Sequence, residues 1–308
     1  MKIFFASSSV FGEIALKKMI ESEVSFSALI TAPDKKCGRG QQIKPLSIKK
    51  TAENFKIKIK EADNSSQFDQ VIENEKPDIV IVAGFKVIIS KKTLDKSLFV
   101  NIHPSLLPEY RGATPIQTAI IDGKEEGGVT IIKMNEKIDQ GPVMTQKSFF
   151  FSNKATYKRA EKELANLGAV ILAEKIDDLF QGKISFKEQD EKKATYTNLL
   201  KKEDGKINWG ESADLIERKI RALNPWPSTY TTLDGKNIKI LEAEVQQQTE
   251  VGPFGNLGKT YLGTNHLIAV QTGENFLLIK KLQREGEKEK TSEDFIRSNI
   301  NLIGHIFK

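Results

Sequence analysis

Apolar runs of strand length alternate with helical patterns over the first 180 residues of the chain. Short runs that indicate buried strands lie at 2–6, 26–31, 78–83 and 98–102. Apolar side chains at helical spacing fill much of 154–180, and a proline at position 115 opens a further short helix. This alternation predicts an α/β fold, a Rossmann-like domain with a mainly parallel sheet. Such sheets bind ligands outside the carboxyl ends of their strands.

The pattern changes after residue 180. The stretch 181–206 is polar and charged, as expected for an exposed linker. After one helical segment at 213–220, short apolar runs broken by Gly and Asn are typical of a small β-barrel. We therefore predict three parts: a catalytic α/β domain over 1–187, a linker over 188–205 and a small OB-like β-barrel domain over 206–308.

Charge and cysteine content narrow the class of protein. The 308 residues carry a net charge of +6, and 39% are hydrophobic, which is typical of a globular protein. Between Asp34 and Lys60, nine Lys and Arg side chains face two acidic ones, an excess that suits either a polyanion or a solvated face. A single cysteine excludes an internal disulfide and, with only three histidines, argues against a zinc site. We expect a cytoplasmic protein with no metal ion and, since no apolar run approaches about 18 residues, no membrane partner.

Three polar residues are candidates for chemistry at the edge of the predicted sheet. Asn101 and His103 stand where the strand 98–102 ends, and side chains two apart in a strand point to the same side. Asn offers a neutral hydrogen-bond donor, and His offers a proton near neutral pH. Asp139 lies in a turn between two predicted strands, from which its carboxylate could return to the same edge. Taken singly, such residues more often cap turns or make structural hydrogen bonds.

The segment that holds two of these residues also carries a family resemblance. Residues 101–116 read Asn-x-His-Pro-Ser-Leu-Leu-Pro-x-Tyr-Arg-Gly-Ala-x-Pro-Ile, which resembles the signature of the folate-dependent formyltransferases. The resemblance implies that Asn101, His103 and Asp139 form the catalytic constellation. It also implies a loop that lines the folate site, which in this chain consists of Ser105, Leu106, Leu107 and Pro108.

Three further stretches are similar to the tRNA-acting branch of this family, the methionyl-tRNA formyltransferases. They are the Gly- and Arg-containing stretch 31–41, the Arg-Ala-Leu-Asn-Pro-Trp-Pro of 221–227 and the segment 286–295. This resemblance implies the transfer of a formyl group from 10-formyltetrahydrofolate, a co-substrate, to the α-amine of initiator methionyl-tRNA. We expect the protein to be a monomer. It assigns the barrel to tRNA binding. In the basic loop, the side chains expected to contact tRNA are Lys35, Lys36, Arg39 and Lys44.

The chain departs from the family pattern at several positions. Ser7–Ser9 stands where Gly-Thr-Pro is usual, Gly84-Phe85 replaces Tyr-Gly, and Ser228 replaces a Gly. Two alternatives stay open: a sugar-nucleotide N-formyltransferase of the same family, and a non-catalytic folate- or RNA-binding module. The basic loop argues against the first, because a compact nucleotide sugar needs no extended basic patch. The intact catalytic set argues against the second.

Overall fold

The computed structural model describes residues 1–37, 42–247, 255–299 and 302–308. The chain divides into two compact units, each assembled from separate stretches of sequence. The first comprises 1–115, 126–151 and 159–197, and the second comprises 116–125, 152–158 and 198–308. Residues 188–197 thus cluster with the first unit, and the domain limits inferred from the sequence remain a prediction.

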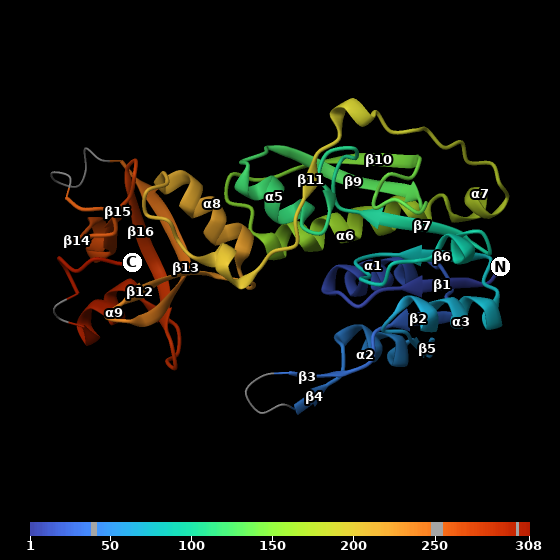
Figure 1. The fold of residues 1–308 in the computed structure, drawn as a ribbon, viewed down its shortest axis with the longest axis horizontal. Helices are drawn as coiled ribbons and strands as arrows, with labels where there is room; N and C mark the ends of the chain where they lie inside the picture. Colours follow the sequence, from blue (N-terminus) through green and yellow to red (C-terminus); the bar gives the residue numbers. More distant parts are fainter. Residues whose placement is uncertain (38–41, 248–254, 300–301) are drawn as a thin grey trace. The chain divides into compact units, whose positions relative to one another are not determined.

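A seven-stranded sheet forms the centre of the first unit (Figure 1). Its strand order is β10-β9-β7-β6-β1-β2-β5, and the five strands from β7 to β5 run parallel while β9 and β10 join antiparallel. This arrangement confirms the mainly parallel sheet that the sequence predicts. The strands are β1 (Ile3–Ala6), β2 (Ala28–Thr31), β5 (Lys58–Glu61), β6 (Ile79–Val82), β7 (Leu98–His103), β9 (Glu126–Lys133) and β10 (Val143–Phe150).

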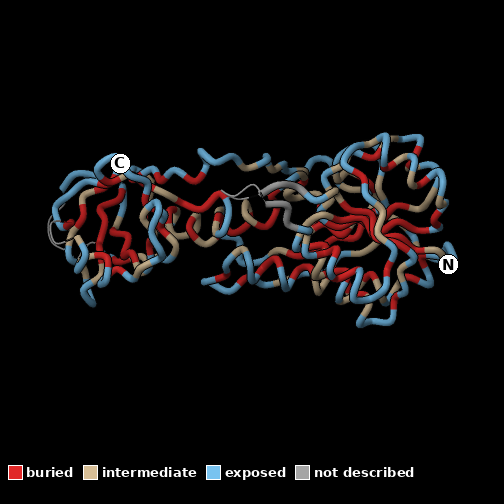
Figure 2. The backbone as a smooth tube through the Cα atoms, turned by 90° about the horizontal axis from the view of Figure 1, so that it is seen from below, coloured by how far each residue is buried: buried red, intermediate tan, exposed pale blue. Residues whose placement is uncertain are grey.

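Helices flank this sheet because their apolar side chains recur on one face. Strands β1, β2 and β6 are buried at every position, as continuous apolar runs predict. Helix α6 lies close to the sheet, since a Cβ on Gly168 would be 2.4 Å from Ile102 and 2.9 Å from Val129. Figure 2 shows buried residues gathered in the interior of the part of the chain that holds the N-terminus. The helices are α1 (Val10–Glu21), α2 (Ser47–Asn54), α3 (Ser65–Glu75), α4 (Lys91–Leu94), α6 (Tyr157–Ala173), α7 (Ile176–Phe180) and the 3₁₀ helix η1 (Glu191–Lys193).

Ser8 and Ser9, which depart from the family pattern, stabilise the turn that follows the carboxyl end of β1. The hydroxyl of Ser9 accepts a hydrogen bond from the Gly12 N–H at 3.1 Å and caps α1. The hydroxyl of Ser8 accepts one from the Ala32 N–H at 2.9 Å. A capping hydroxyl is worth about 1 kcal/mol, so this turn is held without the usual glycine and proline.

Two short strand pairs lie outside the main sheet of the first unit. Strands β3 (Lys35–Cys37) and β4 (Gln42–Lys44) pair antiparallel, with position 35 opposite position 44. Strands β8 (Arg111–Gly112) and β11 (Tyr196–Thr197) pair parallel. These pairs hold parts of the basic loop and of the polar stretch interpreted as a linker.

An antiparallel sheet forms the second unit, as the sequence predicts, with strand order β12-β13-β16-β15-β14 and β17 beside β16. Helix α8 buries Ala213, Ile216, Ile220 and Leu223, spaced as a helix face requires, and Ile216 and Ile220 belong to the hydrophobic core of this unit. No described helix is long and apolar enough to cross a membrane. The elements are β12 (Thr229–Leu233), β13 (Lys236–Gln246), β14 (Thr260–Leu262), β15 (Ile268–Gln271), β16 (Phe276–Arg284), β17 (Lys290–Thr291), α5 (Pro115–Ile121), α8 (Ala213–Leu223), α9 (Ser292–Ser298), η2 (Lys202–Gly205) and η4 (Thr264–His266).

Candidate active site

Asn101 and His103 stand at the carboxyl end of β7, between β6 and β9. Position 101 lies opposite Val82 of β6 and Ile132 of β9, which fixes the strand from both sides. His103 is buried and Asn101 is half-buried. The two side chains therefore share one face at the end of the sheet where α/β folds bind ligands.

Asp139 joins these two residues from the turn between β9 and β10. Its Oδ1 accepts a hydrogen bond from the Asn101 Nδ2 at 3.3 Å and lies 3.6 Å from the His103 Nδ1. Its Oδ2 accepts a hydrogen bond from the Gly112 N–H at 2.8 Å. The structure thus brings together the three residues that the sequence singles out, although they are separated by up to 38 positions.

The imidazole of His103 lies between two oxygen atoms. Its Nε2 is 3.0 Å from the carbonyl oxygen of Tyr110, and its Nδ1 faces the Asp139 carboxylate. A carbonyl can only accept, so Nε2 carries a hydrogen in this arrangement.

The residues predicted to line the folate site, 105–108, form the loop directly after β7. The loop is fixed by its backbone: the Leu107 N–H donates to the Thr130 hydroxyl at 3.0 Å, and the Leu107 carbonyl accepts from the Gln146 amide at 2.7 Å. Thr130 in turn donates to the Ser105 carbonyl at 2.6 Å. Ser105 and Leu107 are buried, so this loop keeps its shape through internal hydrogen bonds.

The sequence does not single out a buried arginine beside this loop. Arg111 is fully buried, and its Nη2 lies 2.7 Å from a carboxylate oxygen of Glu191. The hydrogen bonds that Arg111 donates to Glu191 raise the pKa of Arg111, and the same bonds lower the pKa of Glu191. Two features of the sequence could have indicated this ion pair: the arginine within the motif of 101–116 and the Gln-Asp-Glu run at 189–191. The polar composition around 189–191 instead indicates a linker.

The basic residues of the predicted tRNA loop lie partly outside the described chain. Lys35, Lys36 and Lys44 belong to β3 and β4, and Arg39 lies outside the described residues. The base of this hairpin is held by Lys49, which is 5% exposed and has its Nζ 2.7 Å from Asp34.

A second carboxylate, that of Glu61, also pairs with the Lys49 ammonium. Burial lowers the pKa of Lys49, but the hydrogen bonds that its ammonium donates to Asp34 and Glu61 outweigh that effect and raise the pKa. The ammonium therefore stays charged and joins the start of α2 to the end of β5 and to Asp34, which directly precedes β3.

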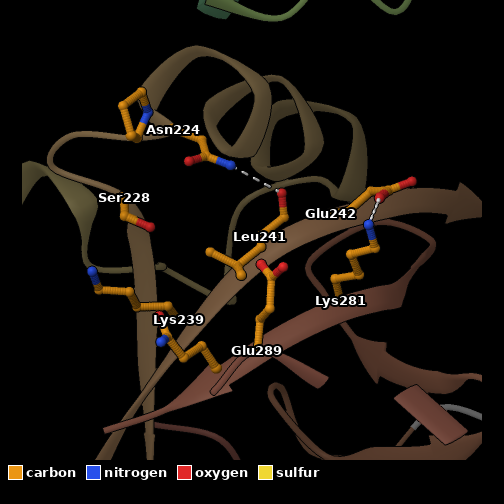
Figure 3. Close-up of a pocket in the computed structure, with 9 residues that line it drawn as sticks. Asn224, Ser228, Lys239, Leu241, Glu242, Lys281 and Glu289 are labelled. Atoms are coloured by element: carbon orange, nitrogen blue, oxygen red, sulfur yellow. Dashed lines mark hydrogen bonds and ion pairs between the residues drawn. The ribbon is translucent and has the colours of Figure 1, made fainter. Parts of the chain in front are cut away.

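A cavity of about 360 Å³ lies in the second unit, beside β13 and β16 (Figure 3). Its wall carries two lysines and two glutamates, and the nearest such pair, Lys281 and Glu242, is 3.7 Å apart. Balanced charge favours neither a polyanion nor a cation, and none of the three candidate catalytic residues lines this cavity. In the described parts of the chain, no group of three or more His, Cys, Asp and Glu side chains is placed to hold a metal ion. The grouped residues at the end of β7 are therefore the better candidate for a reaction site.

Two family models match the chain. The model described as formyl transferase covers residues 1–176, and the model described as formyl transferase, C-terminal domain, covers residues 199–299. A methionyl-tRNA formyltransferase of Syntrophomonas wolfei subsp. wolfei is 34% identical over 302 residues, covering 96% of this chain and 95% of that protein. A methionyl-tRNA formyltransferase of Rickettsia bellii is 35% identical over 301 residues, covering 96% of each.

Solved structures share the fold at lower identity. HypX from Aquifex aeolicus, in complex with tetrahydrofolic acid, aligns with a TM-score of 0.65 at 17% identity, covering 98% of this chain. This chain spans about half the length of HypX, 48% of it. The sugar 3N-formyl transferase WlaRD aligns with a TM-score of 0.64 at 18% identity, covering 94% of this chain and 99% of that one.

Proposed function

The chain belongs to the family of methionyl-tRNA formyltransferases, and we propose that it transfers the formyl group of 10-formyltetrahydrofolate to the α-amine of initiator methionyl-tRNA. The chain covers nearly the full length of its relatives in this family, and the N-terminal and C-terminal family models both match it. The observation that carries the residue assignment is the contact of Asp139 with Asn101, with His103 beside it, at the carboxyl end of the parallel strands.

The proposed reaction forms one bond and breaks another at the formyl carbon. The neutral α-amine attacks this carbon to give a tetrahedral intermediate with an oxyanion. The intermediate then collapses, the bond to the folate nitrogen breaks, and one proton passes from the amine to that nitrogen. Tetrahydrofolate leaves, so the folate is consumed as a co-substrate, and the proposed steps use no metal ion.

Each of the three polar side chains has a distinct part in this reaction. One N–H of the Asn101 amide bonds to Asp139, which fixes the amide and leaves its second N–H to donate to the oxyanion. His103 moves the proton: with its Nε2 bonded to the Tyr110 carbonyl, its Nδ1 is the nitrogen that would accept the proton from the amine and give it to the leaving nitrogen. Asp139 orients the imidazole. The loop 105–108, fixed by its own hydrogen bonds, is proposed to line the folate.

The proposed tRNA contacts lie in the basic hairpin and the second unit. Lys35, Lys36, Arg39 and Lys44 would meet phosphates or an unpaired base near the acceptor end. We propose that the protein acts as a monomer in the cytoplasm, where translation begins. The single cysteine is consistent with a reducing compartment.

The deciding experiment is formyl transfer to charged initiator tRNA, with a nucleotide amino sugar as the parallel acceptor. We expect formylation of the tRNA and none of the sugar. The reverse result would overturn the proposal and favour the chemistry of the sugar formyltransferases, whose fold the chain shares.

A second experiment tests the hairpin itself. Arg39→Ala should lower both kcat and kcat/KM for initiator tRNA, whereas Lys36→Ala should weaken binding modestly and flatten its salt dependence by about one unit of slope. Both variants should keep the parental KM for the folate. If Arg39→Ala formylated tRNA at the parental rate across a salt titration, the hairpin would have no part in tRNA binding.

A further inference from the structure

The guanidinium of the buried Arg111 has an acceptor for every one of its five N–H groups. Nε and Nη2 donate to the Gln189 Oε1 at 3.2 and 2.8 Å. Nη1 and Nη2 donate to the two carboxylate oxygens of Glu191 at 2.9 and 2.7 Å, and Nη1 donates to the Tyr196 hydroxyl at 2.9 Å. A planar guanidinium with this many fixed acceptors is held in one orientation, so it fixes the side chains that are bonded to it.

Gln189 links the Arg111 guanidinium to the turn that carries Asp139. Its oxygen is turned toward the guanidinium, so its amide nitrogen points the other way and donates to the carbonyl oxygens of Asp139 at 2.8 Å and Gly141 at 2.7 Å. The orientation is dictated by chemistry, because a guanidinium only donates and a carbonyl only accepts. All the polar atoms of the Gln189 amide are thereby used.

The turn needs such support because its backbone is strained. Asp139 has φ +53°, in the left-handed region, which a residue with a Cβ adopts only at a cost in backbone energy. A Cβ on Gly141 would lie 1.8 Å from the Lys133 carbonyl oxygen, so the chain also passes close to β9. Holding the carbonyl oxygens at 139 and 141 fixes the direction in which the Asp139 carboxylate leaves the backbone.

We propose that Gln189, held by its hydrogen bonds from Arg111, is a positioning residue that keeps Asp139 against Asn101 and His103. The inference rests on the proposed function, since it assigns Gln189 a part only if Asp139 takes part in the reaction. It places residues 187–197, which we name the strap, at the active site of the first unit.

The strap is also anchored without Gln189. The backbones of Lys187 and Val143 bond to each other in both directions, at 2.7 and 2.8 Å. At its other end, β11 pairs with β8, and the Arg111 N–H donates to the Thr195 carbonyl at 2.9 Å. Substituting Gln189 should therefore leave the strap in place and disturb only the turn.

Two substitutions separate positioning from a merely structural role. Gln189→Met fills the same volume without hydrogen bonds. Gln189→Glu keeps an oxygen for Arg111 but turns a second oxygen toward the carbonyls of Asp139 and Gly141. If Gln189 only held the strap on Arg111, Gln189→Glu would be harmless. We expect both variants to lower kcat for formylation of initiator tRNA by about 10–10²-fold, the scale of a misplacement near 1 Å, with KM for either substrate nearly unchanged.

A double-mutant cycle with Asp139→Asn gives the readout that a structural role would not move. Once the Asp139 carboxylate is gone, adding Gln189→Met should lower kcat by less than about threefold. The exposed Lys193→Ala of the same strap serves as the control and should keep the parental rate. Thermal unfolding of each full-length variant shows that it is folded at the assay temperature.

The outcomes distinguish this inference from the proposed function. If Asp139→Asn kept the parental kcat, the catalytic assignment itself would fall, and the inference with it. If Asp139→Asn lost activity but Gln189→Met and Gln189→Glu kept the parental kcat, only the positioning role would be refuted. Losses that multiply fully in the double mutant would likewise refute it.

Discussion

Buried polar side chains are handled differently in the two units of the chain. Around the candidate site of the first unit, the polar side chains of Asn101, Asp139 and Arg111 all have hydrogen-bond partners in the described structure. The buried side-chain nitrogen and oxygen atoms that lack a partner among the described residues belong to the second unit. They are Ser228 Oγ, both polar atoms of the Gln246 amide and Arg284 Nε.

The difference indicates what each polar group is for. A polar group whose partners are all present can be held in one orientation, which is what a transition state requires of its donors. A buried polar atom without a partner only destabilises the fold, by about 1–3 kcal/mol. Substitutions in the first set should therefore change the rate, whereas removing an unpaired group from the second should change stability and leave the rate alone.

The largest effect should come from the His103–Asp139 pair. His103→Ala and Asp139→Asn should each lower kcat by about 10²–10⁴-fold, because the proton carrier or its orienting partner is lost. Since the two act together, the double mutant should lose far less than the product of the single losses. Steady-state kinetics of the three variants measures this, and fully multiplicative losses would separate the two residues.

Asn101 should come next. Asn101→Ala removes one oxyanion donor, so kcat should fall by about 10²–10³-fold while the affinity for the folate changes little. Its hydrogen bond to Asp139 means that part of the loss reflects a freed carboxylate. Single-turnover rates with saturating folate separate chemistry from binding, and a variant with nearly full kcat would remove Asn101 from the mechanism.

The sequence predicts the elements of this site better than their supports. The run Asp-Ile-Val-Ile-Val-Ala at 78–83 can only be a buried strand or a core helix, and its length decides for a strand, as β6 confirms. The alternation that puts Asn101 and His103 on one face follows from strand geometry alone. These inferences depend on neighbours in sequence, so a pattern can carry them.

The supports depend on residues far apart in sequence. Arg111 meets Gln189 and Glu191 across some 80 positions, and nothing in a polar stretch that is typical of a linker indicates which side chain turns inward. Asp139 has both a structural and a candidate catalytic part. An Asp near a Gly is typical of a turn, and the positive φ of Asp139 confirms the turn, while its carboxylate lies in the candidate site.

A third test measures how much the buried ammonium of Lys49 contributes to stability, compared with the exposed ammonium of Lys50. Lys49→Met removes the ammonium between Asp34 and Glu61, and the thermal unfolding midpoint should fall by about 5 °C. The loss stays moderate because both carboxylates reach water, with 31% and 52% of their side chains exposed. The exposed neighbour Lys50→Met is the matched control. Equal midpoints for the two variants would mean that the ion pairs of Lys49 with Asp34 and Glu61 contribute nothing to stability.

The smallest effect, and the one of opposite sign, should come from Ser228 in the second unit. Ser228 has φ +68°, a conformation that a glycine adopts without strain. Its hydroxyl is buried and has no hydrogen-bond partner among the described residues, although it points toward the cavity in Figure 3. Ser228→Gly relieves about 1–2 kcal/mol of backbone strain and removes the unpaired hydroxyl. Glycine also increases the conformational entropy of the unfolded chain, which opposes this gain in stability by about 0.5–1 kcal/mol. The net expectation is a gain of about 1 kcal/mol, with kcat unchanged.

Ser228→Ala separates the two contributions of this residue. Alanine removes the hydroxyl but keeps a Cβ in the left-handed conformation, so it should recover only the part that comes from the unpaired polar atom. Urea unfolding of the parent, Ser228→Ala and Ser228→Gly should therefore give midpoints that rise in that order, with equal slopes. If Ser228→Gly were instead less stable than the parent, the hydroxyl would have a partner in solution. The two units would then not differ in how they treat buried polar groups at this position, and the contrast would rest on Gln246 and Arg284 alone.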